Sequence, residues 1–267
     1  QSQTCVACAR PSNPHALTMS IPAVVHQRGV EQPAWTALEV WDERKGVTMV
    51  VSFSELSINV RAAARTLKEA GLKCGGRCAI LSHNSVAYVY ASLAVMESGA
   101  TSINMSWRQP DKVNLALLDE LRSGYELMLL TSELFIALAE LARQELDLRC
   151  LLCESICATP LIQSPPLVKL RDTPSPTTLP PDDPECPAIV FFTGGTTGSP
   201  KAVPHTHATL LFLADSYLRE HGAPLNPHVI EHPGSVCFTP FVRSVGIDPN
   251  LFTTLPHPAN LLLSAPV

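Results

Sequence analysis

The sequence predicts an α/β fold in which alternating strands and helices form mostly parallel sheets covered by helices. Between residues 52 and 152, apolar residues at helical spacing alternate with short apolar runs that are typical of buried strands. The 267 residues are 46% hydrophobic and 16% charged, which suffices for one large core or two smaller ones.

The strongest helix signal begins at Ser52. The segment Ser52-Phe-Ser-Glu55 matches a capping box, and Gly71 marks a helix stop. The apolar residues between these two signals recur at helical spacing: Leu56, Val60, Ala63, Leu67 and Ala70. We therefore predict a helix that starts at the capping box and ends at Gly71.

Further units follow this helix in alternating order. Strands are predicted over residues 78–81, 101–103, 127–130 and 148–152. Helices are predicted over residues 85–98, 111–122 and 132–144. The helix over residues 85–98 is expected to end at Gly99 and to carry Val86, Tyr90, Leu93 and Glu97 on one face.

Residues 154–187 break the alternation, because they hold nine prolines and no long apolar period. We predict a linker or a surface connection here. The elements predicted after it are a strand over 189–192, a helix over 209–220, a strand over 235–239, and a helix and a strand within 251–263. At the other end, residues 1–18 are expected to lie outside the fold as a disordered or transit-like segment.

The segment Thr193-Gly-Gly-Thr-Thr-Gly-Ser-Pro-Lys201 follows a predicted buried strand and has the composition of a phosphate-binding loop. Its glycines permit positive φ and a close approach of backbone N–H groups to anionic oxygens. An ammonium about 4 Å from a phosphate oxygen contributes roughly 4 kcal/mol at an effective dielectric constant near 20. The candidate phosphate ligands are Thr193, Gly194, Gly195, Thr196, Thr197, Gly198 and Lys201.

The spacing differs from two other phosphate loops. A Walker A loop places lysine directly after its last glycine, whereas Ser199 and Pro200 intervene here, and the Rossmann pattern G-x-G-x-x-G is absent. Residues 192–201 instead resemble the phosphate loop of the acyl-adenylate-forming superfamily, [YF]-T-S-G-[ST]-T-G-x-P-K-G, with Gly194 in place of Ser and Ala202 in place of the final Gly. A glycine-rich turn that happens to end in lysine is the alternative.

The resemblance implies an enzyme that uses ATP and Mg²⁺ to activate a carboxylic acid as an acyl-adenylate, and then transfers the acyl group to a thiol, usually coenzyme A. It covers residues 19–263, the front half of the large N-terminal domain of such enzymes. Residues 19–267 are accordingly expected to be a partial AMP-binding domain. The catalytic residues and the mobile C-terminal domain are expected beyond Val267, and this fragment alone is expected to be inactive.

One segment departs from the family pattern. The family has Pro-x-[FY]-H-x-x-G near the acyl pocket; this chain keeps Pro240 and Gly246 but carries Val242 and Arg243 at the two middle positions. We treat Val242 and Arg243 as candidates for the substrate pocket, with a surface role for the arginine as the alternative. The acid itself stays open. A truncated, non-catalytic protein that binds a nucleotide or a partner is the second functional hypothesis.

Composition argues against several other classes. A net charge of −5 without a basic cluster argues against nucleic-acid binding, and no apolar stretch approaches the ~20 residues of a membrane span. The two C-x-x-C motifs lack a histidine at zinc-finger spacing, and His205-x-His207 lacks a third ligand, so no metal site is predicted.

The protein is expected to be intracellular, with the cytoplasm as the first choice, because an odd number of cysteines in a large α/β chain fits a reducing compartment. An organelle is the alternative, since the first thirty residues contain no Asp or Glu.

Overall fold

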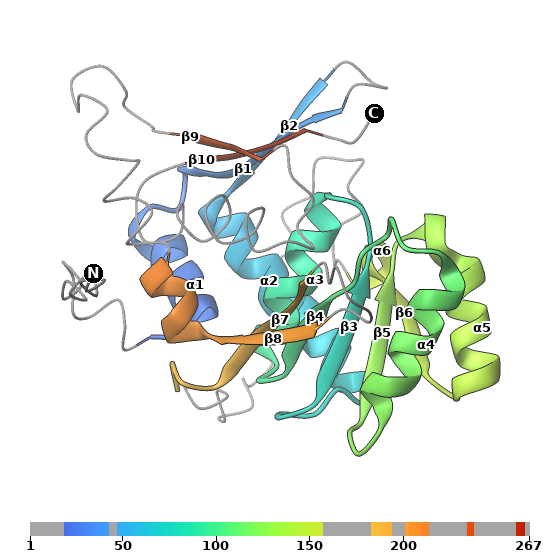
Figure 1. The fold of residues 1–267 in the computed structure, drawn as a ribbon. Helices are drawn as coiled ribbons and strands as arrows, with labels where there is room; N and C mark the ends of the chain where they lie inside the picture. Colours follow the sequence, from blue (N-terminus) through green and yellow to red (C-terminus); the bar gives the residue numbers. More distant parts are fainter. Residues whose placement is uncertain are drawn as a thin grey trace, which may run out of the picture.

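The computed structural model describes residues 19–42, 47–156, 183–193, 201–213, 234–237 and 260–264, and Figure 1 shows their arrangement. A six-stranded sheet with the order β6-β5-β3-β4-β7-β8 forms the centre. Its strands are β3 (Arg77–Leu81), β4 (Thr101–Asn104), β5 (Leu127–Thr131), β6 (Arg149–Leu152), β7 (Pro187–Thr193) and β8 (Lys201–Thr206). All neighbours pair in parallel except β7 and β8, so the predicted mostly parallel α/β fold is confirmed.

Helices cover both faces of this sheet. The described helices are α1 (Ile21–Glu31), α2 (Phe53–Glu69), α3 (Val86–Glu97), α4 (Asp111–Arg122), α5 (Ile136–Leu146) and α6 (Cys153–Ile156), with a 3₁₀ turn η2 (Glu133–Phe135) before α5. The core on one face holds buried residues of α1, α2, α3 and α6, and the core on the other face holds those of α4 and α5. Strand β3 contributes buried side chains to both cores, because successive side chains of a strand point to opposite faces.

Helix α2 begins and ends where the sequence predicts. The Ser52 hydroxyl accepts a hydrogen bond from the Glu55 backbone N–H at 3.2 Å, and the Glu55 carboxylate accepts one from the Ser52 backbone N–H at 2.8 Å. Gly71, just beyond the helix, has φ +97°, a conformation that favours glycine. The capping box is therefore present in full.

Helix α3 is confirmed within the predicted range, and it is buried on all sides. Every residue from Val86 to Met96 is buried, and not only those that share the face of Val86, Tyr90 and Leu93. The reason is that α3 packs against the sheet and also against α1, α2 and α6. A helix covered on all sides is apolar all round, so its periodicity does not mark an inner face.

A partly buried chain of hydrogen bonds joins three helices on this face, α1, α2 and α3. His26 of α1 contacts the Ser57 hydroxyl of α2 at 2.8 Å through Nδ1 and the Glu97 carboxylate of α3 at 3.0 Å through Nε2. Gly29 lies so close to Ser57 that a Cβ there would be 2.8 Å from the Ser57 Cβ. Ser57 is thus packed against Gly29 of α1 and hydrogen-bonded to His26 of the same helix, and these contacts hold α1 against α2.

A second sheet has the order β2-β1-β10-β9 and lies on the side of α2 (Figure 1). Its strands are β1 (Thr36–Asp42), β2 (Val47–Ser52), β9 (Gly234–Cys237) and β10 (Asn260–Ser264). Strands β9 and β10 confirm predicted strands. The sequence analysis missed β1 and β2, although both runs are rich in β-branched and aromatic residues on either side of Glu43-Arg-Lys-Gly46.

Three further points complete the comparison with the sequence. Strand β6 ends at Leu152, as predicted, and Cys153 begins the short helix α6, which the sequence analysis did not predict. Strand β8 was missed: it is six residues long and contains Pro204, which an edge strand tolerates. Of the predicted helix over 209–220, residues 207–213 are helical, and the remainder lies outside the described residues.

The predicted connection over 154–187 is described only at its two ends. Residues 154–156 belong to α6 and Pro187 begins β7. Residues 1–18 and the helix predicted within 251–259 lie outside the described residues. Within the described part of the chain, no helix combines the length and the apolar character that a membrane crossing requires.

Candidate functional site at the carboxyl edge of the six-stranded sheet

The predicted phosphate loop is the connection of a β-hairpin. Strands β7 and β8 are antiparallel, and Thr193 pairs with Lys201 directly before and after the loop. Of the candidate ligands, the structure therefore places Thr193 and Lys201 side by side, and the Lys201 side chain is exposed. Gly194, Gly195, Thr196, Thr197 and Gly198 lie outside the described residues, as do Val242 and Arg243.

The base of this hairpin is anchored in the core. Strand β7 pairs in parallel with β4, with Ser102 opposite Ile189 and Ile103 opposite Val190. Ile189 is fully buried, and Phe191 is 4% exposed. A loop that starts from such a strand has one end fixed by packing, which favours precise placement of ligand groups.

The hairpin loop leaves the sheet at its carboxyl edge, where β3, β4, β5 and β6 also end (Figure 1). The helix after β3 packs on one face of the sheet and the helix after β4 packs on the other. Neighbouring parallel strands whose connections leave on opposite faces define a topological switch point, the usual ligand-binding position of open α/β sheets. The loop after β7 is one strand away from this point, since β7 is the neighbour of β4.

An aromatic cluster occupies the switch point. His83 follows β3 and Trp107 follows β4, and their ring centroids are 4.2 Å apart. Phe135 of η2 stacks on the His83 ring, with the ring centroids 5.2 Å apart. Burial lowers the pKa of His83, so the neutral imidazole is favoured. The Nδ1 atom of His83 is buried and has no hydrogen-bond partner among the described residues.

Other buried polar atoms lie at the same edge. Thr131 Oγ1, Ser132 Oγ and Glu154 Oε2 have no hydrogen-bond partner within the described ranges. Burial raises the pKa of Glu154, and the nearby charge of Glu133 adds to this effect. Unpaired buried polar atoms are rare in native proteins and often belong to sites that bind or react.

The sequence His83-Asn84-Ser85 predicts a loop that ends in a helix cap, so it did not mark His83 as a site residue, and Trp107, Thr131 and Glu154 were not considered. The cap itself is confirmed, because the Ser85 hydroxyl accepts a hydrogen bond from the Tyr88 backbone N–H at 3.0 Å. A signal was available: His83 comes two residues after a buried strand, at the end where ligand-binding loops emerge.

The two histidines of His205-x-His207 have separate contacts. The His205 ring meets Phe191 edge-on at 5.5 Å, and burial lowers the His205 pKa. His207 is 5% exposed, and its Nδ1 accepts a hydrogen bond from the Ile21 backbone N–H at 3.3 Å. His207 thus fastens the start of α1. Among the residues that the structure describes, no three His, Cys, Asp or Glu side chains form a group that could hold a metal ion.

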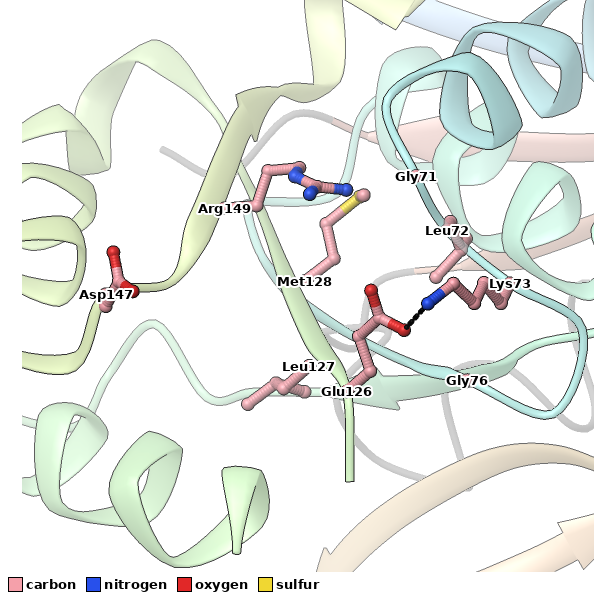
Figure 2. A pocket seen from close by; sticks show the side chains of 9 residues that line it. All are labelled: Gly71, Leu72, Lys73, Gly76, Glu126, Leu127, Met128, Asp147 and Arg149. Atoms are coloured by element: carbon pink, nitrogen blue, oxygen red, sulfur yellow. Dashed lines mark ion pairs between the residues drawn. The ribbon is translucent and has the colours of Figure 1, made fainter. Parts of the chain in front are cut away.

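A pocket of about 150 Å³ lies at the opposite, amino edge of the sheet, and Figure 2 shows its lining. Its charged groups are engaged: the Lys73 ammonium is 2.8 Å from the Glu126 carboxylate, and the Arg149 guanidinium donates to the Ala70 carbonyl at the end of α2. Lys73 and Arg149 both lower the pKa of Glu126. The charged residues of this pocket thus have structural roles, in a helix cap and an ion pair. The carboxyl edge is therefore kept as the candidate site.

Comparison with known sequences identifies the family of this chain. The sequence pattern of the AMP-binding enzyme family matches residues 25–266. The chain therefore belongs to the AMP-binding enzyme family, whose members form adenylates.

Two curated relatives illustrate the range of the family. A nonribosomal peptide synthetase of Aspergillus violaceofuscus is 27% identical over 187 residues, which are 70% of this chain and 2% of the relative. The mitochondrial malonate–CoA ligase of Mus musculus is 28% identical over 137 residues, which are 50% of this chain and 21% of the relative. The chain thus spans about a fifth or less of the length of these relatives.

Solved structures share the fold. The o-succinylbenzoate coenzyme A synthetase of Bacillus subtilis in complex with AMP has a TM-score of 0.69 at 21% identity, covering 91% of this chain and 56% of that one. The same synthetase with ATP and magnesium ion gives 0.67 at 20% identity, covering 90% and 56%. A fatty acyl-adenylate ligase from L. pneumophila, with acyl adenylate and pyrophosphate, gives 0.70 at 17% identity, covering 95% and 41%.

Proposed function

We propose that the complete protein activates a carboxylic acid with ATP as an acyl-adenylate and then transfers the acyl group to the thiol of coenzyme A. The observation that supports this proposal is the pairing of Thr193 with Lys201 across the hairpin of β7 and β8, whose strand β7 is the neighbour of β4 at the switch point, in a chain of the AMP-binding enzyme family. The relatives that match this chain include a CoA ligase and a CoA synthetase.

In the first step, a carboxylate oxygen of the acid attacks the α-phosphorus of ATP and pyrophosphate leaves. Negative charge grows on the bridging and departing oxygens, so donors that are already in place lower the barrier. We assign this role to the backbone N–H groups and hydroxyls of the loop and to the Lys201 ammonium. The ligands are Thr193, Gly194, Gly195, Thr196, Thr197, Gly198 and Lys201. When bound, Mg²⁺ would neutralise phosphate charge; no residue is assigned to hold it.

The register of the hairpin supports the assignment of Lys201. Because Lys201 is paired with Thr193, both ends of the loop are held at the spacing of neighbouring strands, ~5 Å. Seven residues, 194–200, then connect two fixed points that are close together. Such a compact loop can turn several N–H groups toward one anion.

The proposal is tested by exchange of radiolabelled pyrophosphate into ATP, measured on the full-length protein with a panel of carboxylic acids. We expect exchange with at least one acid, and formation of its CoA thioester when coenzyme A is added. Exchange without a thioester would point to another acceptor, such as the carrier-protein thiol of peptide synthetases. The absence of exchange with every acid would contradict the proposal.

The alternative is a protein that binds a nucleotide or a partner without catalysis. Ala202 and the pair Val242 and Arg243 favour it, because each stands where the family pattern has a different residue. The two hypotheses differ in one result: the alternative predicts that ATP binds, measured by calorimetry, while exchange stays at background with all acids.

A further inference from the structure

Two thiols from distant parts of the chain share one small cavity at the amino edge of the six-stranded sheet. The cavity has a volume of about 30 Å³, and Cys74 and Cys186 both line it. Cys74 is exposed and Cys186 is partly exposed, and both are free thiols. We propose that Cys74 and Cys186 form a reversible disulfide under oxidising conditions, so that this cavity is a thiol-modification site.

Backbone hydrogen bonds hold the two cysteines near each other. The N–H of Gly75, next to Cys74, donates to the Gly99 carbonyl at 2.8 Å. The Thr101 hydroxyl donates to the carbonyl of Pro187, next to Cys186, at 3.2 Å. Both cysteines are therefore tethered to the same short segment, residues 99–101, which leads into β4.

The side chains also have freedom to meet. A Cβ built on Gly75 would find no atom within 4 Å, so the turn beside Cys74 is open. The Cys186 thiol now donates to the Asp183 carboxylate over 3.6 Å, a long contact even for sulfur. A disulfide requires the two Cα atoms to come within about 4.4–6.8 Å, so the Cys186 thiol must leave Asp183 and the open turn at Cys74 must approach it.

The two thiols differ in reactivity, and this difference decides which of them is oxidised first. Burial raises the pKa of Cys186, and the Asp183 carboxylate adds to the effect by repelling a thiolate. Cys74 is the more exposed thiol, so it meets a dissolved oxidant first. Cys186 then acts as the resolving thiol.

With hydrogen peroxide as the oxidant, the steps balance as follows. The Cys74 thiolate attacks one peroxide oxygen, the O–O bond breaks, and hydroxide leaves, which yields a sulfenic acid. The Cys186 sulfur attacks the Cys74 sulfur, the S–O bond breaks, and the departing oxygen takes up the Cys186 proton to leave as water. Two thiols and one peroxide thus give one disulfide and two waters. A reduced dithiol such as dithiothreitol reverses the bond by thiol exchange.

The product would be a disulfide cross-link at the amino edge of the six-stranded sheet. It would link the turn before β3 to the residue before β7, closing a loop of more than a hundred residues. Cross-links that close long loops stabilise chiefly by restricting the unfolded chain, so the melting temperature should rise on oxidation.

The test uses the full-length protein, treated under native conditions with one equivalent of hydrogen peroxide. Remaining thiols are alkylated, the protein is digested, and the peptide masses are measured by mass spectrometry. We expect a linked peptide pair containing Cys74 and Cys186 that dithiothreitol separates. Cys74→Ser and Cys186→Ser should each abolish the pair, whereas Cys150→Ser, a partly buried thiol near the opposite core, should keep it.

Two results would overturn the proposal. One is oxidation of Cys74 that stops at a sulfenic or sulfinic acid while Cys186 is still alkylated in full. The other is an equal yield of the linked pair in denaturant, which would show that the fold does not direct the pairing. Neither result depends on whether the protein forms adenylates.

Discussion

The two edges of the six-stranded sheet differ in how far their polar side chains are paired. At the amino edge, Lys73 pairs with Glu126, the Arg77 guanidinium lies 3.3 Å above the centre of the Tyr125 ring, and Arg149 caps α2. At the carboxyl edge, buried polar atoms of four residues have no hydrogen-bond partner within the described ranges: His83, Thr131, Ser132 and Glu154.

This difference separates stability from function within one sheet. A buried polar atom without a partner costs about 1–3 kcal/mol, so a fold selected for stability alone would pair it or replace it. At the amino edge the charged groups follow that rule; His205 Nδ1, on β8 opposite Ile189, is the exception among the described residues nearer that edge. The carboxyl edge has more such atoms, at the position where α/β sheets bind ligands, and we infer that a substrate completes their hydrogen bonds.

The comparison is tested most strongly by removing one lysine from each edge. Lys201→Ala in the full-length protein should lower adenylation by about 30- to 1000-fold, because the substitution deletes roughly 2–4 kcal/mol of transition-state stabilisation. Lys73→Ala is the matched control: its ammonium is 74% exposed and should leave adenylation unchanged. The measurements are pyrophosphate exchange and melting temperature, and the latter should change little in either variant. Full activity of Lys201→Ala would show that the loop is a structural turn.

The second largest effect is expected at Gly71, on the amino edge. A Cβ at this position would overlap the Arg149 guanidinium, and φ of +97° is strained for any other residue. Gly71→Ala should therefore cost roughly 1–2 kcal/mol of folding free energy, from backbone strain and from displacement of the Arg149 side chain off the Ala70 carbonyl, while the activity of the folded fraction is kept.

Gly124→Ala is the control for this substitution. Gly124 has φ of +77° but no atom within 4 Å of a built Cβ, so only the backbone term of roughly 1 kcal/mol applies. Both variants would be measured by chemical denaturation. Equal losses in the two variants would contradict the role of Arg149 as a cap that lies over Gly71.

The elements that the sequence predicts best are those with local signals. Helix α2 has its capping box and its terminal glycine, and α4 spans Asp111–Arg122, the predicted range. Strand β1 was missed although one partner, β2, is its neighbour in the chain; its other partner, β10, is more than two hundred residues away. Among the described strands, β2 and β8 each pair only with the preceding strand, so the sequence analysis overlooked two local hairpins.

The candidate site likewise has one part with a local sequence signal and one part that depends on residues far apart in the chain. The loop from Thr193 to Lys201 is a contiguous motif, so the sequence analysis found it, and its role in phosphate binding stays a prediction. The contact of His83 with Trp107 joins residues on two loops, and only the parallel register of β3 and β4 brings them together. A reading along the chain has no access to that register.

The third prediction concerns Glu154 at the carboxyl edge. Its pKa is raised in the folded state, so stability from this group is fully present below pH 4.5, its ordinary pKa, and is lost as pH rises through the folded value. Glu154→Gln removes this loss. The variant should match the parent near pH 4 and should melt higher than the parent at neutral pH. A variant that melts lower at neutral pH would mean that the carboxylate has a stabilising partner.

The smallest expected effect is that of His83, and it has the opposite dependence on pH. Burial lowers the pKa of His83 below its ordinary 6.5, so the unfolded state binds the proton more readily and the folded protein loses stability as pH falls below about 6.5. His83→Phe keeps a ring between Trp107 and Phe135 and cannot titrate. Above pH 7 the variant should be as stable as the parent or slightly more stable, because a buried Nδ1 without a described partner is removed.

Below pH 6.5 the advantage of His83→Phe should grow. If the carboxyl edge is the site of chemistry, the same variant should also lose adenylation activity although its fold is intact. Melting curves between pH 5 and 8, together with pyrophosphate exchange at pH 7.5, measure both quantities. A variant that loses stability at every pH, by as much as truncation of an ordinary core residue, would show that His83 is a structural residue. The two edges would then differ in packing rather than in function.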